Sequence, residues 1–278
     1  MINGCVKIVG KNLKQNIDLN LVGLNKLQKI ISLSELNPTY CLDHESIEAV
    51  ANKIITEGHR RLAVLAKNKK VVGIITSMDI LGAFLHRQNF NEPISTIMNR
   101  EVIFCDANES VGNVIQKFKF SRKGGFPIID KGKLVGMISE RDIVRRLATI
   151  NFDVKVEEIM TKKPFYITSN ISILDALKTM VNTHYRRLPV VENKKLIGIV
   201  TCADILSFLR NNQFDFSSLL KSIIPTFNKE VHCIEKDKDV SEAIRTMIKY
   251  DVGGLPVVNE NNTLDGIITE RDILEKIV

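Results

Sequence analysis

Apolar and polar positions along this chain change their period in an order that returns four times. The clearest stretch begins with a short apolar run at 102–105 and continues with apolar residues at helical spacing in 110–118. Two apolar segments then surround the turn residues 131–133, and helical spacing resumes over 139–147. A period near 3.6 predicts a helix, and two short runs around a glycine turn predict a hairpin. We therefore expect each unit to fold as strand, helix, strand, strand, helix.

Each unit is marked by a nine-residue phrase that starts with glycine. The phrases begin at Gly73, Gly136, Gly198 and Gly266, between 62 and 68 residues apart. Units of this size are too small to bury a stable core alone, so an α/β fold of paired repeats is expected. We assign 1–35 to an N-terminal extension that packs on the repeats. The four repeats are assigned to 36–92, 93–150, 151–212 and 213–278.

Every phrase carries a hydroxyl residue three positions after its glycine and an aspartate three positions later. A hydroxyl that ends a strand, followed by such an acid, is typical of a capping box at the start of a helix. An aspartate at a helix start can also accept hydrogen bonds from the vicinal hydroxyls of a ribose. The two roles are compatible. The pairs are Thr76 with Asp79, Ser139 with Asp142, Thr201 with Asp204, and Thr269 with Asp272.

Composition fits a globular chain of one or two domains, because 44% of its residues are hydrophobic and 26% are charged. No apolar run approaches the length of a membrane span or a signal peptide, so we expect a cytoplasmic protein without a membrane partner. The net charge of +7 favours anionic partners of any kind. Five cysteines without a C-x-x-C pair are expected to be small buried residues in a reducing compartment: Cys5, Cys41, Cys105, Cys202 and Cys233.

Candidate catalytic groups are scattered along the chain. The five histidines form none of the motifs of zinc proteases, and neither serine-hydrolase nor phosphate-binding P-loop motifs are present. Cys41 and His44 have a ligand-like spacing, but a metal site needs further ligands. We therefore expect no enzymatic activity, no metal ion and no cofactor.

The phrases resemble the motif of CBS domains, the regulatory modules named after cystathionine β-synthase. Each phrase reads G-h-h-[ST]-x-x-D-[IL], where h is apolar, and follows an apolar segment such as F-P-I-I at 126–129 or L-P-V-V at 188–191. Four copies in register extend the resemblance from about residue 36 to the last residue. The resemblance implies two Bateman modules that form a disc, similar to the γ subunit of AMP-activated protein kinase. It also implies clefts that hold adenosine-containing ligands, with the aspartate of each motif on the ribose.

Basic residues and glycines alternate between odd and even repeats. Before the hairpin, odd repeats carry basic runs at 59–61 and 184–187, whereas even repeats carry glycine pairs at 124–125 and 253–254. This alternation predicts that repeat one pairs with two and repeat three with four. The glycines would let a base or phosphate approach the backbone closely.

The basic runs also supply candidate phosphate ligands. Guanidinium groups grip phosphate oxygens with two parallel hydrogen bonds, and even repeats place an arginine inside the motif itself. The alternative is a solvated charged edge. In the γ subunit the His-Arg pairs lie in even repeats, so which clefts are occupied stays open. The expected phosphate-binding residues are His59, Arg60, Arg61, Lys123, Arg141, His184, Arg186, Arg187 and Arg271.

We interpret the chain as a regulatory protein that binds AMP, ADP or ATP and acts in trans on an unidentified protein partner. An S-adenosyl compound is the alternative ligand, although it has no phosphate for the arginines to bind. A nucleic-acid-binding scaffold is a further alternative that rests only on the pI near 9.1. Whether the chain forms a homodimer stays open.

Overall fold

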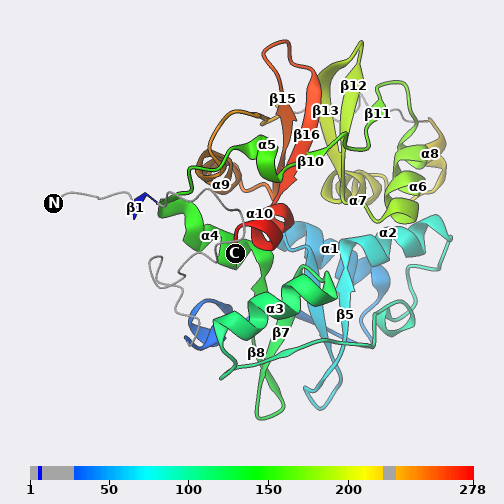
Figure 1. Ribbon diagram of the computed structural model, residues 1–278. Coiled ribbons are helices and arrows are strands. Elements are labelled where there is room, and N and C mark those ends of the chain that lie inside the picture. The colour runs from blue at the N-terminus through cyan, green and yellow to red at the C-terminus, as the bar shows by residue number, and fades with distance from the viewer. Residues whose placement is uncertain (1–5, 8–27, 222–229) are drawn as a thin grey trace.

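The computed structural model describes residues 6–7, 28–221 and 230–278 (Figure 1). Each repeat forms a strand, a helix, a hairpin and a second helix, as the sequence predicts. The first repeat contains β3 (Tyr40–Leu42), α1 (Ile47–Glu57), β4 (Arg61–Leu65), β5 (Val71–Thr76) and α2 (Ser77–Leu85). The second contains β6 (Cys105–Asp106), α3 (Val111–Ser121), β7 (Gly125–Asp130), β8 (Lys133–Ser139) and α4 (Glu140–Arg146).

The second half of the chain repeats this order. The third repeat contains β11 (Ile167–Thr168), α6 (Ile173–Thr183), β12 (Arg187–Glu192), β13 (Lys195–Thr201) and α7 (Cys202–Asn211). The fourth contains β14 (Ile234–Glu235), α9 (Val240–Lys249), β15 (Gly254–Val258), β16 (Leu264–Thr269) and α10 (Glu270–Lys276). Two short helices lie in the connections, α5 (Val156–Ile159) and α8 (Ser217–Lys221).

Repeats exchange edge strands within two pairs. In every repeat the first strand runs parallel to the hairpin, whose two strands are antiparallel. The short strand β2 (Glu35–Leu36), which leads into repeat one, pairs with β8 of repeat two. Likewise β10 (Thr161–Lys162), which leads into repeat three, pairs with β16 of repeat four. The predicted pairing of one with two and of three with four is thus confirmed by the sheets.

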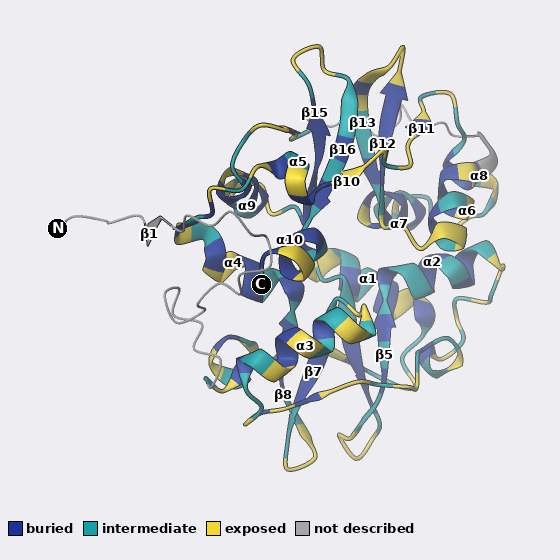
Figure 2. Ribbon diagram, in the orientation of Figure 1, coloured by how far each residue is buried: buried dark blue, intermediate teal, exposed yellow. Residues whose placement is uncertain are grey.

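The hydrophobic cores cross the boundary between the two pairs. One cluster of buried residues combines the odd repeats, including Ile80 of α2 and Leu177 of α6, and the other combines the even repeats, including Ile143 of α4 and Ile273 of α10. Figure 1 shows the sheets of each pair in opposite halves of the molecule with helices between them, and Figure 2 shows buried positions on those helices. Each repeat therefore completes its core with a repeat of the other pair.

Residues 28–34 pack on repeat two as part of its core. Ile30 is fully buried, its backbone N–H donates to the carbonyl of Glu109 at 2.8 Å, and Val111 donates to the carbonyl of Gln28 at 2.9 Å. The strand β1 (Val6–Lys7) pairs with β9 (Ile150–Asn151). The rest of the predicted extension lies outside the described residues.

The cysteine prediction is wrong for Cys233, which is exposed because it lies on the irregular stretch before β14. Cys41, Cys105 and Cys202 are buried as expected, and burial raises the pKa of the Cys41 and Cys105 thiols to about 12. Cys5 lies outside the described residues. Within the described part of the chain, no helix is long and apolar enough to cross a membrane, and no cluster of three candidate metal ligands is found.

We expect Ile30→Ala to lower the free energy of unfolding by about 2–4 kcal/mol, because it removes a fully buried side chain and leaves a cavity in repeat two. Leu36→Ala is the control: Leu36 is 58% exposed, and its loss should change stability by about 0.5 kcal/mol or less. Urea unfolding of both variants measures the difference. Equal effects would mean that residues 28–34 do not belong to the core.

Candidate functional site

All four motif pairs form capping boxes at the start of their helices. The backbone N–H of the aspartate donates to the hydroxyl oxygen at 3.3 to 3.4 Å in repeats one, three and four. In every repeat the carboxylate accepts from the backbone N–H of the hydroxyl residue. That second hydrogen bond measures 2.7 to 2.9 Å in the four copies and always ends on Oδ2. The side-chain hydroxyl donates to the same oxygen at 2.6 to 2.7 Å. The capping interpretation is therefore correct for every repeat.

The second carboxylate oxygen, Oδ1, differs between the even repeats. Among the described residues, none donates a hydrogen bond to Oδ1 of Asp142, which is half-buried. Oδ1 of Asp272 accepts from Oγ1 of Thr161 at 3.2 Å and lies 3.8 Å from Nζ of Lys276, and Asp272 is 9% exposed. Asp142 thus keeps an acceptor available for a bound hydroxyl while it caps its helix.

Asp142 lines an open cleft of about 230 Å³, which we call the Asp142 cleft. Repeat one contributes its lead-in and the turn after α1, repeat two contributes β8 and the start of α4, and repeat four contributes Asp251 and Glu270. A carboxylate and several guanidinium groups therefore line one space. The lining residues are Glu35, Pro38, Thr39, Gly58, His59, Arg60, Arg61, Gly124, Met137, Ile138, Ser139, Arg141, Asp142, Arg145, Asp251 and Glu270.

Two buried glutamates at the centre of the molecule form ion pairs with arginines. Oε1 of Glu270 accepts from Nε of Arg141 at 2.7 Å, and its Oε2 lies 3.1 Å from Nη1 of Arg60. Oε1 of Glu140 accepts from Nε of Arg271 at 2.9 Å. Each glutamate is 5% exposed. Because repeats two and four each supply a glutamate to the other's arginine, the ion pairs join the two pairs of repeats.

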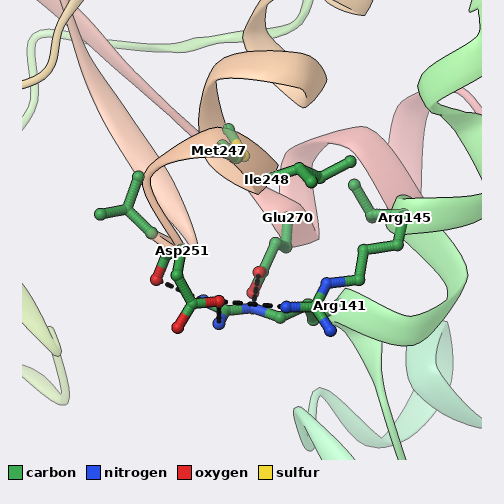
Figure 3. A pocket seen from close by; sticks show the side chains of 8 residues that line it. Arg141, Arg145, Met247, Ile248, Asp251 and Glu270 are labelled. Atoms are coloured by element: carbon green, nitrogen blue, oxygen red, sulfur yellow. Dashed lines mark hydrogen bonds and ion pairs between the residues drawn. The ribbon is translucent and has the colours of Figure 1, made fainter.

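Arg141 is held on both sides by carboxylates of repeat four. Its Nη1 lies 2.6 Å from Oδ1 of Asp251 and its Nη2 donates to the Asp251 carbonyl at 3.3 Å, in addition to the bond to Glu270 (Figure 3). Arg145, one turn further along α4, also contacts Asp251, at 3.1 Å. Asp251 follows α9 and has a left-handed backbone with φ of 51°.

The glycine pairs make room for arginines of the odd repeats. A Cβ at Gly125 would overlap Nη1 of Arg61, and one at Gly254 would overlap Nη1 of Arg187. Arg187 also donates to the carbonyl of Gly253 at 2.6 Å. The expectation that a base or a phosphate approaches the glycines is corrected for Gly125 and Gly254, since an arginine of the paired repeat fills the space beside each of them.

Burial at the centre shifts the pKa values of its charged groups. Desolvation, helped by the neighbouring Arg186, lowers the pKa of the Arg61 guanidinium to about 10. Desolvation also lowers the pKa of Arg187, an effect that Glu270 opposes. The pKa of Glu140 is raised by burial, against the pull of Arg271 and Arg186. These central charged groups therefore lie in poorly solvated surroundings.

The remaining predicted ligands lie less centrally. His59 lines the Asp142 cleft, with Nε2 3.1 Å from Oγ1 of Thr39 and 3.4 Å from Oε2 of Glu57. Arg186 comes within reach of Gly124, because a Cβ there would lie 3.3 Å from its Nη1. His184 and Lys123 are exposed on turns after α6 and α3.

Sequence reasoning missed Glu140, Glu270 and Asp251. A signal for the glutamates was present, because both even motifs place glutamate directly after the hydroxyl residue, where odd motifs have Ser77 and Cys202. Asp251 left no such signal, because its equivalent in repeat two is a basic residue.

The sequence profile of the CBS domain matches four segments of the chain, 32–86, 94–149, 156–211 and 221–278. The chain belongs to the CBS-domain family. It is similar to protein MJ1225 of Methanocaldococcus jannaschii, with 32% identity over 244 residues that cover 78% of this chain and 87% of the relative. These matches confirm the resemblance inferred from the motifs.

The fold of this CBS-domain chain also matches solved structures. The crystal structure of MJ1225, described as a candidate archaeal homologue of γ-AMPK, superimposes with a TM-score of 0.82 at 29% identity and covers 90% of this chain and 100% of that one. A protein from Pyrococcus horikoshii superimposes with a TM-score of 0.62 at 20% identity and covers 90% of this chain and 100% of that one. The second likeness shows the shared fold alone.

We expect Gly125→Ala to destabilise the protein by about 1–3 kcal/mol, because the added methyl would collide with Arg61 and lie 2.9 Å from the carbonyl of Ile138. Gly82→Ala in α2 is the matched control. No atom lies within 4 Å of its added Cβ, and alanine should stabilise the helix by up to about 1 kcal/mol. Thermal unfolding compares the two. Destabilisation by neither change would contradict the packing of Arg61 on Gly125.

Proposed function

We propose that this CBS-domain chain is a regulatory protein that binds adenine nucleotides, AMP, ADP or ATP, between its paired repeats. The observation that supports the proposal most is the Asp142 cleft, where an aspartate with an available acceptor oxygen faces Arg60, Arg61 and Arg141. A carboxylate can accept two hydrogen bonds from ribose hydroxyls. Guanidinium groups can bind the phosphates through paired hydrogen bonds.

The capping geometry supports a ribose role and does not compete with it. Oδ2 of Asp142 caps α4, whereas its Oδ1 has no hydrogen-bond donor among the described residues. A ribose at Oδ1 would leave the helix start intact. By repetition of the motif, Thr76 with Asp79, Thr201 with Asp204, and Thr269 with Asp272 are proposed for the same role.

We place the regulatory effect in the ion pairs between the two pairs of repeats. A phosphate in the Asp142 cleft would compete with Glu270 of repeat four for Arg60 of the other pair, and a longer phosphate chain would compete for Arg141 as well. Nucleotides with different charge would then favour different relative positions of the two pairs. A ligand shifts such an equilibrium only by its difference in affinity between the two states. The proposed output is recognition of the altered surface by a protein partner in trans.

We expect Asp142→Ala to weaken AMP binding at the Asp142 cleft by at least about tenfold, because two charge-assisted hydrogen bonds to the ribose are lost. Asp175→Ala is the matched control. Asp175 holds the same helix position behind the cap residue Ser172, with a 2.7 Å hydrogen bond from its hydroxyl, but lies outside the motif. Isothermal calorimetry with AMP measures both variants. Unchanged affinity after Asp142→Ala would refute the ribose role.

The same titration separates nucleotides from an S-adenosyl ligand. Arg60→Ala should weaken ATP binding and leave S-adenosylmethionine unaffected, since only ATP carries phosphates. Binding of S-adenosylmethionine with no binding of AMP, ADP or ATP would favour the adenosyl alternative. Displacement of every ligand by DNA at low salt would favour the nucleic-acid alternative.

A further inference from the structure

The two even repeats place opposite charges at one equivalent position beside their central arginine. Asp251 lies two residues before Gly253, and Arg122 lies two residues before Gly124. Both residues closely follow the first helix of their repeat, and both have left-handed backbones, with φ of 51° and 54°. The shared conformation shows that the two positions correspond. Their charge is reversed.

This reversal changes how the two motif arginines are occupied. Arg141 contacts carboxylate or carbonyl oxygens through all three guanidinium nitrogens, on Glu270 and on Asp251. Among the described residues, Arg271 has a carboxylate partner only in Glu140, reached through Nε at 2.9 Å and Nη2 at 2.7 Å. Its Nη1 has no hydrogen-bond or ion-pair partner in that part of the chain, whereas its buried Nη2 lies against Glu140 alone. Arg141 is therefore saturated by internal anions, whereas Arg271 is not.

We propose that Asp251 acts as an internal anion that limits the Asp142 cleft to nucleotides of low charge, while the equivalent site at Asp272, with Arg122 in place of Asp251, prefers the triphosphate. This inference rests on the proposed function. In the Asp142 cleft the four arginines of the lining face four carboxylates, those of Glu35, Asp142, Asp251 and Glu270. A γ-phosphate that reached Arg141 would have to displace Asp251 and would meet its negative charge. A monophosphate avoids that position.

The Asp272 site has fewer carboxylates and more basic groups at the positions equivalent to those of the Asp142 cleft. Thr161 takes the place of Glu35 on the exchanged edge strand, since both precede the residue that pairs with the motif glycine. Its Oγ1 donates to Oδ1 of Asp272 at 3.2 Å, and a ribose hydroxyl would replace it there. Arg122 takes the place of Asp251, and Nη1 of Arg271, which has no partner among the described residues, is left for a further anion. Two carboxylates of the Asp142 cleft are thus absent from the equivalent positions, which favours a ligand with more negative charge.

Aromatic side chains add a second difference between the two sites. Thr39 and His59 line the Asp142 cleft, and the residues at the same repeat positions beside Asp272 are Phe165 and Tyr185. Their ring centroids lie 6.2 Å apart, and each residue is 49% exposed. Exposed rings at this position can stack on an adenine base. Such stacking would strengthen the binding of any adenine nucleotide at the Asp272 site and leave the choice between AMP and ATP to the charged residues.

Calorimetry on chains that keep one motif aspartate tests the proposal. In an Asp79→Ala, Asp204→Ala, Asp272→Ala chain, which keeps Asp142, we expect AMP to bind at least as tightly as ATP. Adding Asp251→Asn should tighten ATP about tenfold and change AMP little, since one repulsive charge beside the outer phosphates is lost. Asparagine tolerates the left-handed backbone at this position. Asp237→Asn, an equal charge change at an exposed residue away from the cleft, should change neither affinity.

The reverse experiment uses the Asp79→Ala, Asp142→Ala, Asp204→Ala chain, in which Arg122→Asp should weaken ATP and spare AMP. Circular dichroism and melting confirm that each chain is folded. If AMP and ATP bind the wild type but neither substitution shifts their affinity ratio, the inference is overturned and the proposed function stands. If no nucleotide binds the wild type, both fail. A shift in opposite directions for Asp251→Asn and Arg122→Asp establishes the inference.

Discussion

A carboxylate that leaves water must be met by cations, and the centre of this molecule is built on that constraint. Glu140 and Glu270 are each 5% exposed, and an unpaired charge at such a depth costs several kcal/mol. Neither repeat that carries a glutamate can supply the cations alone. Arg141 and Arg60 reach Glu270 from the first pair of repeats, and Arg271 reaches Glu140 from the second. The charged centre therefore forms only when both pairs come together.

The apolar cores follow the same logic on a larger scale. A repeat of about 60 residues cannot bury both faces of its sheet and helices, so it exchanges an edge strand with one neighbour and shares a helical core with another. Strands join repeats within a pair, whereas helices and ion pairs join repeats across pairs. A movement of one pair against the other must therefore rearrange helix packing and the central ion pairs together. Such coupling is what a ligand-driven change in shape requires.

Local features were predictable from the sequence because they depend on residues close together in the chain. The order of elements, the hairpin turns and the four capping boxes all follow from spacing. The partners of the arginines could not be predicted from spacing, because Glu270 lies 129 residues from Arg141 and contacts it only after the two pairs of repeats dock. The glycine pairs were misread for the same reason: sequence shows that a side chain is missing, but not that Arg61 and Arg187 of other repeats fill the space.

The duplicated repeats share the residues that the fold requires and differ at residues that a bound ligand would contact. The capping boxes are the same in every copy because each helix start has the same unsatisfied N–H groups. The position shared by Asp251 and Arg122 does not cap a helix start. The backbone there requires only a residue that accepts a left-handed conformation. Charge there is free to diverge while the fold stays intact. A difference between two sites related by repetition is therefore most informative at positions such as this one, where stability does not dictate the residue.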